Sequence, residues 1–282
     1  MTTDAITTVR TSSVLGAPPL ARSALGAGPT GTRAPRPVAA ENATIVERED
    51  ISASVARFVV RPDGPMLPFR AGQYLALGLR LDGRMVQRPY STAACPRTAS
   101  AHEFLVRHVP DGALTPHLWH LDVGGRVHLG PPKGLFVLEA DDPRTHLLVS
   151  SGTGLAPFIS MTRTLVDRGQ PPRVVVVHGV SHAADLAYRD RLDAWDRGGL
   201  VRYVPTVSRP GDPANAAWRG RTGRTDAALA EACGALDPAT TVAYLCGNPG
   251  MVDGAERLLR SRGFDDVRAE RFWGPGQATA AA

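Results

Sequence analysis

HLLVSSGTGLAPF, residues 146–158, is the stretch that decides the fold of the second half of this 282-residue chain. Its first six residues, with the apolar run LLV (147–149) among them, are typical of a buried strand, and the glycines of GTG (152–154) then let the chain turn sharply. Pro157 fits the first turn of a following helix, whose free N–H groups and positive dipole end attract anions. The stretch therefore predicts a strand, a glycine turn and a helix. The turn is either a diphosphate site or simply a tight connection.

Strands and helices alternate from this stretch to the end of the chain. Further strands are expected at RVVVVHGV (173–180), LVRYVPTVS (200–208), TVAYLCG (241–247) and DVRAERFW (266–273). Helices are expected near residues 184–197, 225–233 and 250–262. A run of four valines indicates a strand buried on both faces, and strands that alternate with helices form parallel, doubly wound sheets. We therefore expect an α/β domain over residues 141–273.

Short strands without helical stretches fill residues 41–140. They are expected at SVARFVVR (54–61), QYLALGLR (73–80), EFLVRHV (103–109), GRVHLG (125–130) and GLFVLE (134–139). The alternation of AGQYLALGLRLDGRMV (71–86) is typical of one half-buried strand, which runs on toward RPYS (88–91). Closely spaced short strands bounded by Gly, Pro and Asp predict an antiparallel barrel or sandwich.

Composition separates the two ends of the chain from its body. Residues 1–40 are rich in Ala, Gly, Pro, Thr and Ser, and they carry four arginines and one aspartate, which is +3 of the net charge of +5. We expect a disordered extension there, either a transit peptide or a dispensable segment, and a short C-terminal tail at 274–282. A basic arm with a nearly neutral body is weak evidence for nucleic acid, so no nucleic-acid partner is expected.

The cysteine count limits the redox chemistry of the chain. Cys95, Cys233 and Cys246 are too few for a four-thiolate iron–sulfur cluster, and no CxxC pair occurs. No metal site is expected. Unpaired cysteines favour a reducing compartment, so we expect a cytoplasmic protein. Because no apolar run approaches about 18 residues, no membrane span is expected.

Two stretches in the first half have the chemistry to hold a nucleotide with a flat ring. In RPYS, Arg88 can pair with a phosphate, Tyr90 offers an aromatic face, and Ser91 can donate a hydrogen bond to a ring nitrogen, while Pro89 fixes the backbone between them. In VPDGALTP (109–116), the backbone around a glycine and a threonine could wrap a diphosphate.

Three stretches in the second half have a functional and a structural interpretation each. LCGNPGMV (245–252) places Cys246 at a strand tip, where it is either beside a flat ring or a buried cysteine before a helix cap. TVSRP (206–210) and WRGRTGRTD (218–226) carry four arginines that either bind a phosphate monoester or form a solvated loop. AERFW (269–273) ends in an aromatic pair that either covers a ring or belongs to the core.

Taken together, these stretches resemble the ferredoxin/flavodoxin–NADP reductase family of the bacterial type over residues 41–273. The matches follow the family's order: PFRAGQY, DGRMVQRPYS, VPDGALTP, GLFVL, GTGLAPF, AADLAY, TVSR, TGR, CGNPGMV and AERFW. The resemblance implies a two-domain fold, with an FAD-binding antiparallel β-barrel at 41–140 and an NADP-binding, doubly wound parallel α/β domain at 141–273.

The resemblance also implies the site residues. Those for FAD are Arg88, Pro89, Tyr90, Ser91, Leu105, Ala113, Leu114, Thr115, Thr153, Phe272 and Trp273. Those for NADP are Gly152, Thr153, Gly154, Ser208, Arg209, Arg224, Cys246, Gly247, Asn248 and Met251. Those for the hydride step are Ser91, Cys246, Glu270 and Phe272.

The activity implied is that of a monomeric reductase, in which a hydride from NADPH passes through FAD as single electrons to ferredoxin or flavodoxin. Ser181 replaces an arginine of some relatives just before AADL, which weakens the preference for NADP over NAD, and Leu105 replaces a tyrosine of some relatives. An NADH-dependent reductase of free flavin or of an oxygenase is the alternative enzyme. A flavin-binding sensor without turnover is the alternative from another class.

Overall fold

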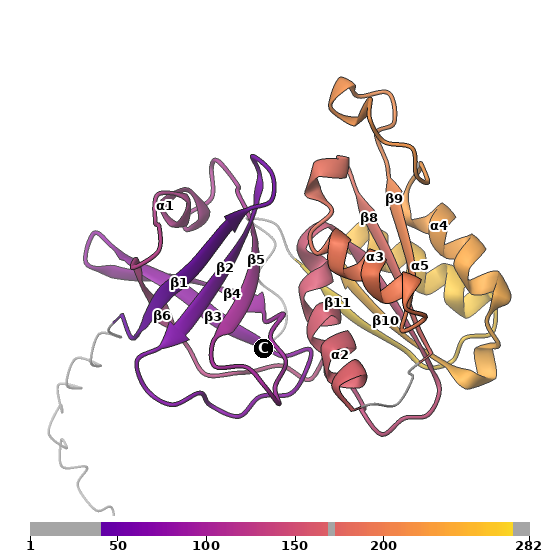
Figure 1. Cartoon of the computed structure of the whole chain (residues 1–282), viewed down its shortest axis with the longest axis horizontal. Coiled ribbons are helices and arrows are strands. Elements are labelled where there is room, and N and C mark those ends of the chain that lie inside the picture. The colour runs from indigo at the N-terminus through magenta and orange to yellow at the C-terminus, as the bar shows by residue number, and fades with distance from the viewer. Residues whose placement is uncertain (1–40, 169–172, 273–282) are drawn as a thin grey trace, which may run out of the picture. The chain divides into compact units, whose positions relative to one another are not determined.

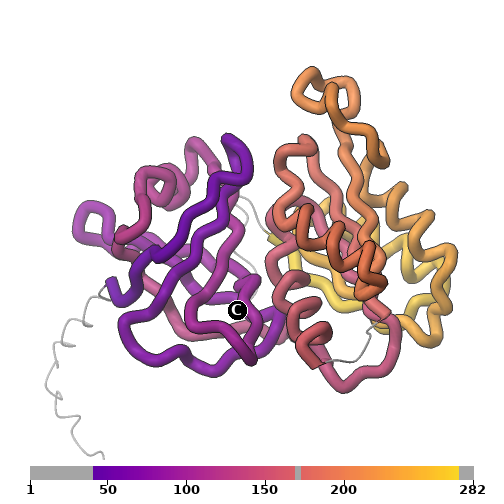
Figure 2. Tube along the Cα trace, viewed as in Figure 1, coloured from indigo at the N-terminus to yellow at the C-terminus, as the bar shows by residue number. Residues whose placement is uncertain are grey.

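The computed structural model describes residues 41–168 and 173–272. The expectations for residues 1–40, for Trp273 and for the tail at 274–282 fall outside these ranges. Within the ranges, consecutive parts of the chain build two separate sheets, and the chain passes once from the first sheet to the second (Figure 2).

The first sheet is antiparallel and has six strands. They are β1 (Ala43–Asp50), β2 (Val55–Pro62), β3 (Tyr74–Leu81), β4 (Arg84–Ser91), β5 (His102–Arg107) and β6 (Arg126–Leu129), with helix α1 (Thr115–Trp119) before β6. Their order is β4-β3-β6-β1-β2-β5. A bridge between Thr92 and Phe104 joins the two outer strands, and the amide of Ala93 donates to the carbonyl of Glu103 at 2.7 Å, so the sheet closes into the expected barrel.

The second sheet is parallel and has five strands. They are β7 (Thr145–Ser151), β8 (Val174–Val180), β9 (Arg202–Val207), β10 (Thr241–Gly247) and β11 (Val267–Arg271). The helices between them are α2 (Ala156–Asp167), α3 (Arg189–Arg197), α4 (Thr225–Ala232) and α5 (Pro249–Ser261). All seven residues of β8 and of β10 are buried, because α2 and α3 cover one face of the sheet while α4 and α5 cover the other (Figure 1). The doubly wound parallel sheet is confirmed.

The structure differs from the expected elements at four places. Residues 71–86 are two strands rather than one, because Asp82 and Gly83 have φ of 47° and 75° and form a two-residue hairpin turn. Strand β1 went unrecognised, although at its start buried Ala43 and Ile45 alternate with half-buried Thr44 and Val46. The helix expected from residue 184 begins only at Arg189, after Tyr188 takes a left-handed φ of 55°.

The run GLFVLE (134–139) is not a strand. Gly134 leaves the extended conformation with φ of 105°, and only Lys133 before it pairs with β3. Three consecutive residues, Phe136, Val137 and Leu138, are buried, which an alternating strand with one solvated face would not allow. Phe136 instead packs edge-on against Tyr244 of β10, with ring centroids 5.8 Å apart.

Buried polar contacts join the two sheets. Glu103 of β5 pairs with Arg163 of α2, and it also accepts hydrogen bonds from the Tyr188 hydroxyl at 2.8 Å and from Arg57 at 3.2 Å. Its side chain is 13% exposed, so its charge is compensated by two guanidinium groups and a hydroxyl rather than by water.

We expect Glu103→Gln to lower the free energy of unfolding by about 2–4 kcal/mol, because an amide cannot neutralise the largely buried Arg163 guanidinium, whereas Arg57 keeps Glu47 and Glu49 as partners. The matched control is Glu47→Gln, since Glu47 pairs with the same Arg57 but is 61% exposed. That loss should stay below about 1 kcal/mol. Urea denaturation of both variants measures the difference, and equal losses would show that burial of the Glu103 cluster does not matter.

Candidate functional site

The point where the chain reverses its direction across the parallel sheet locates the candidate site. In the order β11-β10-β7-β8-β9, strands β7 and β10 are neighbours, and the chain proceeds from them toward opposite edges. In open α/β sheets, ligands bind outside the carboxyl ends of the strands at such a point. Strand β7 ends at Ser151, before the GTG turn, and β10 ends at Gly247, inside CGNPGMV. Both glycine motifs therefore meet there.

The two strand ends approach so closely that glycine is required. A Cβ on Gly154 would lie 2.4 Å from the carbonyl oxygen of Cys246, and a Cβ on Gly247, whose φ is 137°, would lie 2.5 Å from the Oγ of Ser151. A Cβ on Gly152 would meet nothing within 4 Å, and its φ is 54°. The turn thus presents bare backbone to open space, and this geometry fits the close approach of a diphosphate or a flat ring.

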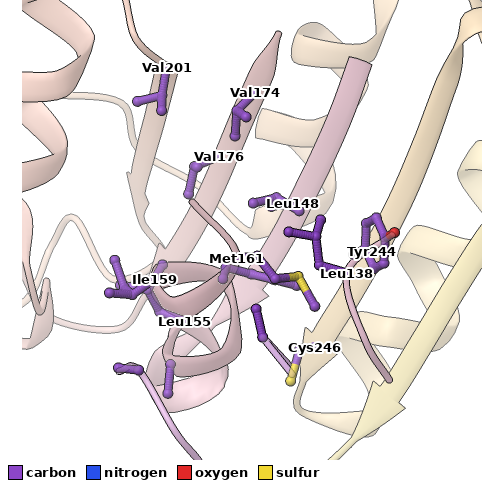
Figure 3. Packing of buried hydrophobic residues seen from close by; sticks show 14 of the residues in the cluster. Leu138, Leu148, Leu155, Ile159, Met161, Val174, Val176, Val201, Tyr244 and Cys246 are labelled. Atoms are coloured by element: carbon purple, nitrogen blue, oxygen red, sulfur yellow. The ribbon is translucent and has the colours of Figure 1, made fainter. Parts of the chain in front are cut away.

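Cys246 contributes to this site mainly through its backbone. Its side chain is 0% exposed and belongs to an apolar cluster with Leu155 and Met161 (Figure 3). Burial, and then the nearby charge of Glu270, raise the pKa of the Cys246 thiol well above its usual value. The thiol is therefore protonated at neutral pH.

A hydrogen bond between the two sheets brings three sequence-predicted residues together. Ser91, 3% exposed at the end of β4, donates from its Oγ to Oε1 of Glu270 at 3.2 Å. Glu270 lies opposite Cys246 in the parallel register of β10 and β11. Burial raises the pKa of Glu270 to about 7, although the Ser91 hydrogen bond acts in the other direction. The site thus holds a carboxyl group that titrates near neutral pH, where a group with a pKa near the working pH is best suited to proton transfer.

Phe272 and Thr153 complete the group at the strand ends. The amide of Phe272 donates to the carbonyl of Gly247 at 2.8 Å, and its half-buried ring packs against the same apolar cluster as Cys246. Thr153 is half-buried in the turn η1 (Gly152–Leu155). Asn248 caps α5, because its side chain accepts from the Gly250 amide at 3.0 Å, and Met251 is buried in the core at 4% exposure.

In the first sheet, the side chains of RPYS separate by strand alternation. Arg88 and Tyr90 share one face of β4, and Pro89 and Ser91 share the other. The Arg88 guanidinium is exposed, and within the described part of the chain its one hydrogen bond goes to the carbonyl of Gln87 at 2.8 Å, so it is accessible to an anion. Burial raises the pKa of Tyr90 to about 12.

The loop before α1 is closed by its own hydrogen bonds. The Thr115 hydroxyl donates to the carbonyl of Val109 and accepts from the Val109 amide, both at 3.0 Å. Leu114 is buried and Ala113 is exposed. The exposed backbone of this loop is compatible with a diphosphate, whereas its threonine hydroxyl is already bonded. Leu105 is buried at 3% exposure in the cluster that also holds Leu155.

The ends of β8 and β9 collect the residues predicted for a phosphate monoester. The amide of Val207 donates to the carbonyl of Arg221 at 3.1 Å, and the amide of Gly223 donates back to Val207 at 2.9 Å. These bonds place Arg224 beside the strand end that continues into Ser208 and Arg209. Arg224 is 71% exposed and lies 3.4 Å from a carboxylate oxygen of Asp226.

The four arginines of this region are not equivalent. Arg221 pairs with Glu231, and Arg219 donates to the carbonyl of Ala216 at 2.6 Å, so both serve the protein itself. The exposed Arg209 guanidinium makes no hydrogen bond or ion pair with any residue in the described ranges, which leaves it available to a ligand.

The sequence analysis missed His178, a buried histidine that forms a hydrogen bond to the backbone of the glycine turn. It is fully buried in β8, its Nε2 lies 3.0 Å from the carbonyl oxygen of Gly152, and its Nδ1 lies 3.4 Å from the Tyr203 hydroxyl. Burial lowers the pKa of His178 to about 4, so the ring is neutral and Nε2 carries the proton that it donates to Gly152. The signal was available, because a histidine inside the valine run must find buried hydrogen-bond partners.

Among residues 41–168 and 173–272, no helix is long and apolar enough to cross a membrane. None of the His, Cys, Asp and Glu side chains in these ranges form a group of three or more that could hold a metal ion.

Comparisons with known proteins agree with this arrangement. Residues 42–138 match the oxidoreductase FAD-binding domain, and residues 148–257 match the oxidoreductase NAD-binding domain. Ferredoxin–NADP reductase B of Sorangium cellulosum is 34% identical over 206 residues, which are 71% of this chain and 82% of that protein.

Reductases of oxygenase systems are also similar. The reductase subunit of an aromatic O-demethylase from an Amycolatopsis species is 32% identical over 261 residues, which are 90% of this chain and 75% of that protein. The crystal structure of the Amycolatopsis cytochrome P450 reductase GcoB superposes with a TM-score of 0.72 at 31% identity, covering 82% of this chain and 69% of that one.

The raised pKa of Glu270 gives the folded protein a specific pH dependence. An ordinary Glu releases its proton near pH 4.5, so between about pH 4.5 and 7 the folded state binds more protons than the unfolded state. The contribution of Glu270 to stability therefore falls as the pH rises through this window.

We expect the variant Glu270→Gln, whose side chain at position 270 stays neutral, to respond differently from wild type. Its free energy of unfolding relative to wild type should increase from pH 5 to pH 8 by up to about 3 kcal/mol. Urea denaturation across this range measures the change. Glu256→Gln on neighbouring α5 is the control, and an equal increase in both variants would contradict the assignment to Glu270.

Proposed function

The chain belongs to the ferredoxin/flavodoxin–NADP reductase family of FAD-dependent oxidoreductases, and from this premise we propose that it transfers electrons from NADPH to ferredoxin or flavodoxin. The observation that supports this proposal best is the meeting of the Ser91–Glu270 pair from two sheets with the bare glycine turn at Gly152–Gly154. We assign residues 41–140 to the FAD-binding domain and residues 141–273 to the NADP-binding domain.

In this proposal the first sheet and its loop hold FAD. Arg88 pairs with the diphosphate, the loop at Ala113–Thr115 wraps it, and Tyr90 lies against the flavin ring. Bound FAD would supply the exchange between a two-electron hydride and single electrons, while the protein supplies orientation and electrostatics. The exposed Arg88 guanidinium and the exposed Ala113 are compatible with these roles.

The residues at the strand ends orient the nicotinamide and manage one proton. Thr153 and the backbone of Cys246 and Gly247 form the surface on which the nicotinamide lies. Phe272 covers the face of the flavin ring and shifts so that the nicotinamide can stack there, which is a gating motion. Ser91 donates a hydrogen bond to the Glu270 carboxylate. Once that carboxyl is protonated, it can donate to the Ser91 Oγ in turn, and the hydroxyl then releases its own proton to the site. Trp273 is assigned to adenine on the resemblance alone.

We propose NADP rather than NAD as the substrate, with Ser208, Arg209 and Arg224 holding the 2′-phosphate. The uncommitted Arg209 guanidinium supports this choice, since a phosphate monoester gives it the bidentate partner that it lacks. We further propose a cytoplasmic protein, supported by its three free cysteines.

The second candidate is a reductase component of an oxygenase. It is favoured by the similarity to the O-demethylase reductase subunit, which extends over 90% of this chain. The two candidates share the hydride step and differ in the electron acceptor.

The first experiment is an anaerobic titration of the purified yellow protein, followed by a panel of acceptors. We expect about one equivalent of NADPH to bleach the flavin absorbance, and the reduced protein to be reoxidised faster by ferredoxin or flavodoxin than by free flavin. Faster reoxidation by free flavin or an oxygenase would favour the second candidate. A flavin that NADPH and NADH both leave oxidised would indicate a binding protein without turnover.

The second experiment tests the choice of dinucleotide. We expect Arg209→Ala with Arg224→Ala to raise the KM for NADPH about tenfold or more, because each exposed phosphate contact contributes roughly 1 kcal/mol, and to leave the KM for NADH nearly unchanged. Arg219→Ala with Arg221→Ala is the matched control, since these two arginines bond to the protein. Equal changes in the two KM values would reject the 2′-phosphate assignment.

A further inference from the structure

A carboxylate lies beside the arginine that we assign to the 2′-phosphate. Asp212 follows Arg209 by three residues, and its pKa is lowered by the Ala214 amide, by His182 and by the nearby charge of Arg209. The Asp212 amide donates to the Arg209 carbonyl at 3.1 Å, so the two residues share one tight turn and their side chains start from neighbouring positions. An anion site with a free carboxylate next to its arginine contains its own competitor, because an ion pair between the two would occupy the guanidinium and repel a phosphate.

Both oxygens of Asp212 are held by other groups. Oδ1 accepts from the amide of Ala214 at 2.9 Å, and this bond caps the short turn η3 (Pro213–Asn215). Oδ2 lies 3.2 Å from Nε2 of His182, in the loop that follows β8. The other ring nitrogen of His182 lies 3.7 Å from a carboxylate oxygen of Asp185. Asp212 thus points to the histidine, and Arg209 is left without an ion pair.

Asn215 fixes the two loops that carry this pair. Its Nδ2 donates to the carbonyls of Ser181 at 3.0 Å and Arg209 at 2.8 Å, and its Oδ1 accepts from the Ala183 amide at 2.8 Å. The side chain is 3% exposed, and both of its amide protons are used. The Asn215 hydrogen bonds reach the residues on both sides of His182 in one loop and the Arg209 carbonyl in the other. They therefore hold the backbones of His182 and Arg209 at a fixed separation.

We propose that His182 is a positioning residue for phosphorylated dinucleotides: by holding Asp212, it keeps the Arg209 guanidinium free for the 2′-phosphate. This inference rests on the assignment of Arg209 in the proposed function. When His182 is removed, Asp212 turns to Arg209, and the phosphate must compete with a carboxylate that is already in place.

The test measures binding of two small probes, adenosine 2′,5′-bisphosphate and AMP, to the purified flavoprotein by calorimetry. We expect His182→Ala to weaken bisphosphate binding about three- to fivefold, the effect of an exposed ion pair, and to change AMP binding less than about twofold. Adding Asp212→Asn to His182→Ala should restore bisphosphate binding, because the competing charge is gone. His182→Gln keeps a donor for Asp212 and should bind like wild type.

The chain contains a matched control for the aspartate. Asp237 begins the sequence DPAT as Asp212 begins DPAN, and Asp237 caps its own short turn by accepting from Ala239 at 3.0 Å. Asp237→Asn removes the same charge and alters the same kind of cap away from Arg209. Combined with His182→Ala, it should restore nothing.

The variant Arg209→Ala distinguishes a failure of the 2′-phosphate assignment from a failure of the role of His182. If Arg209→Ala binds the bisphosphate no worse relative to AMP than wild type does, the 2′-phosphate site itself is wrongly placed and the proposed NADP preference falls. Two outcomes would leave the NADP assignment standing and reject the role of His182. In the first, Arg209→Ala loses the preference for the bisphosphate over AMP but His182→Ala keeps it. In the second, His182→Ala loses this preference and adding Asp212→Asn does not restore it.

Discussion

The site depends on a close backbone contact between the turn after β7 and the end of β10. Gly154 faces the carbonyl of Cys246 there, with no room for a Cβ. Both glycine motifs depend on it. Because the turn after β7 is pressed against the end of β10, their backbones form one continuous surface at the switch point of the sheet. A larger side chain at Gly154 or Gly247 would separate the two motifs.

The first sheet contributes one side chain beside this surface. Ser91 stands at the end of β4, and the buried polar contacts of Glu103 keep that sheet against α2. The chemistry of the site is thus divided between two sheets, with the hydroxyl donor on one and the carboxyl acceptor on the other. A buried ion pair contributes little net stability, but removing one of its partners is costly because the other charge is then left uncompensated. Such a pair therefore fixes the geometry around it.

The sequence was sufficient for the architecture and for the residues at strand ends. Glycines, buried valine runs and their order predicted the parallel sheet, because these patterns report local backbone geometry and burial. It was insufficient where a side chain depends on distant parts of the chain. The bond from Ser91 to Glu270 spans 179 positions, and the use of Arg221 by Glu231 rather than by a ligand is equally invisible in a basic run. The failure at GLFVLE has the same origin, since Phe136 is buried by packing against Tyr244 rather than by strand pairing.

His178 has a consequence for how the site responds to acidity. Its ring is neutral from about pH 5 upward, so the hydrogen bond that supports Gly152 is unchanged over the range in which Glu270 changes its charge. The hydrogen bond that supports the glycine turn and the charge of Glu270 therefore change over separate pH ranges. A protein arranged in this way can alter the protonation of its site during turnover while the shape of the surface on which the ligand rests stays constant.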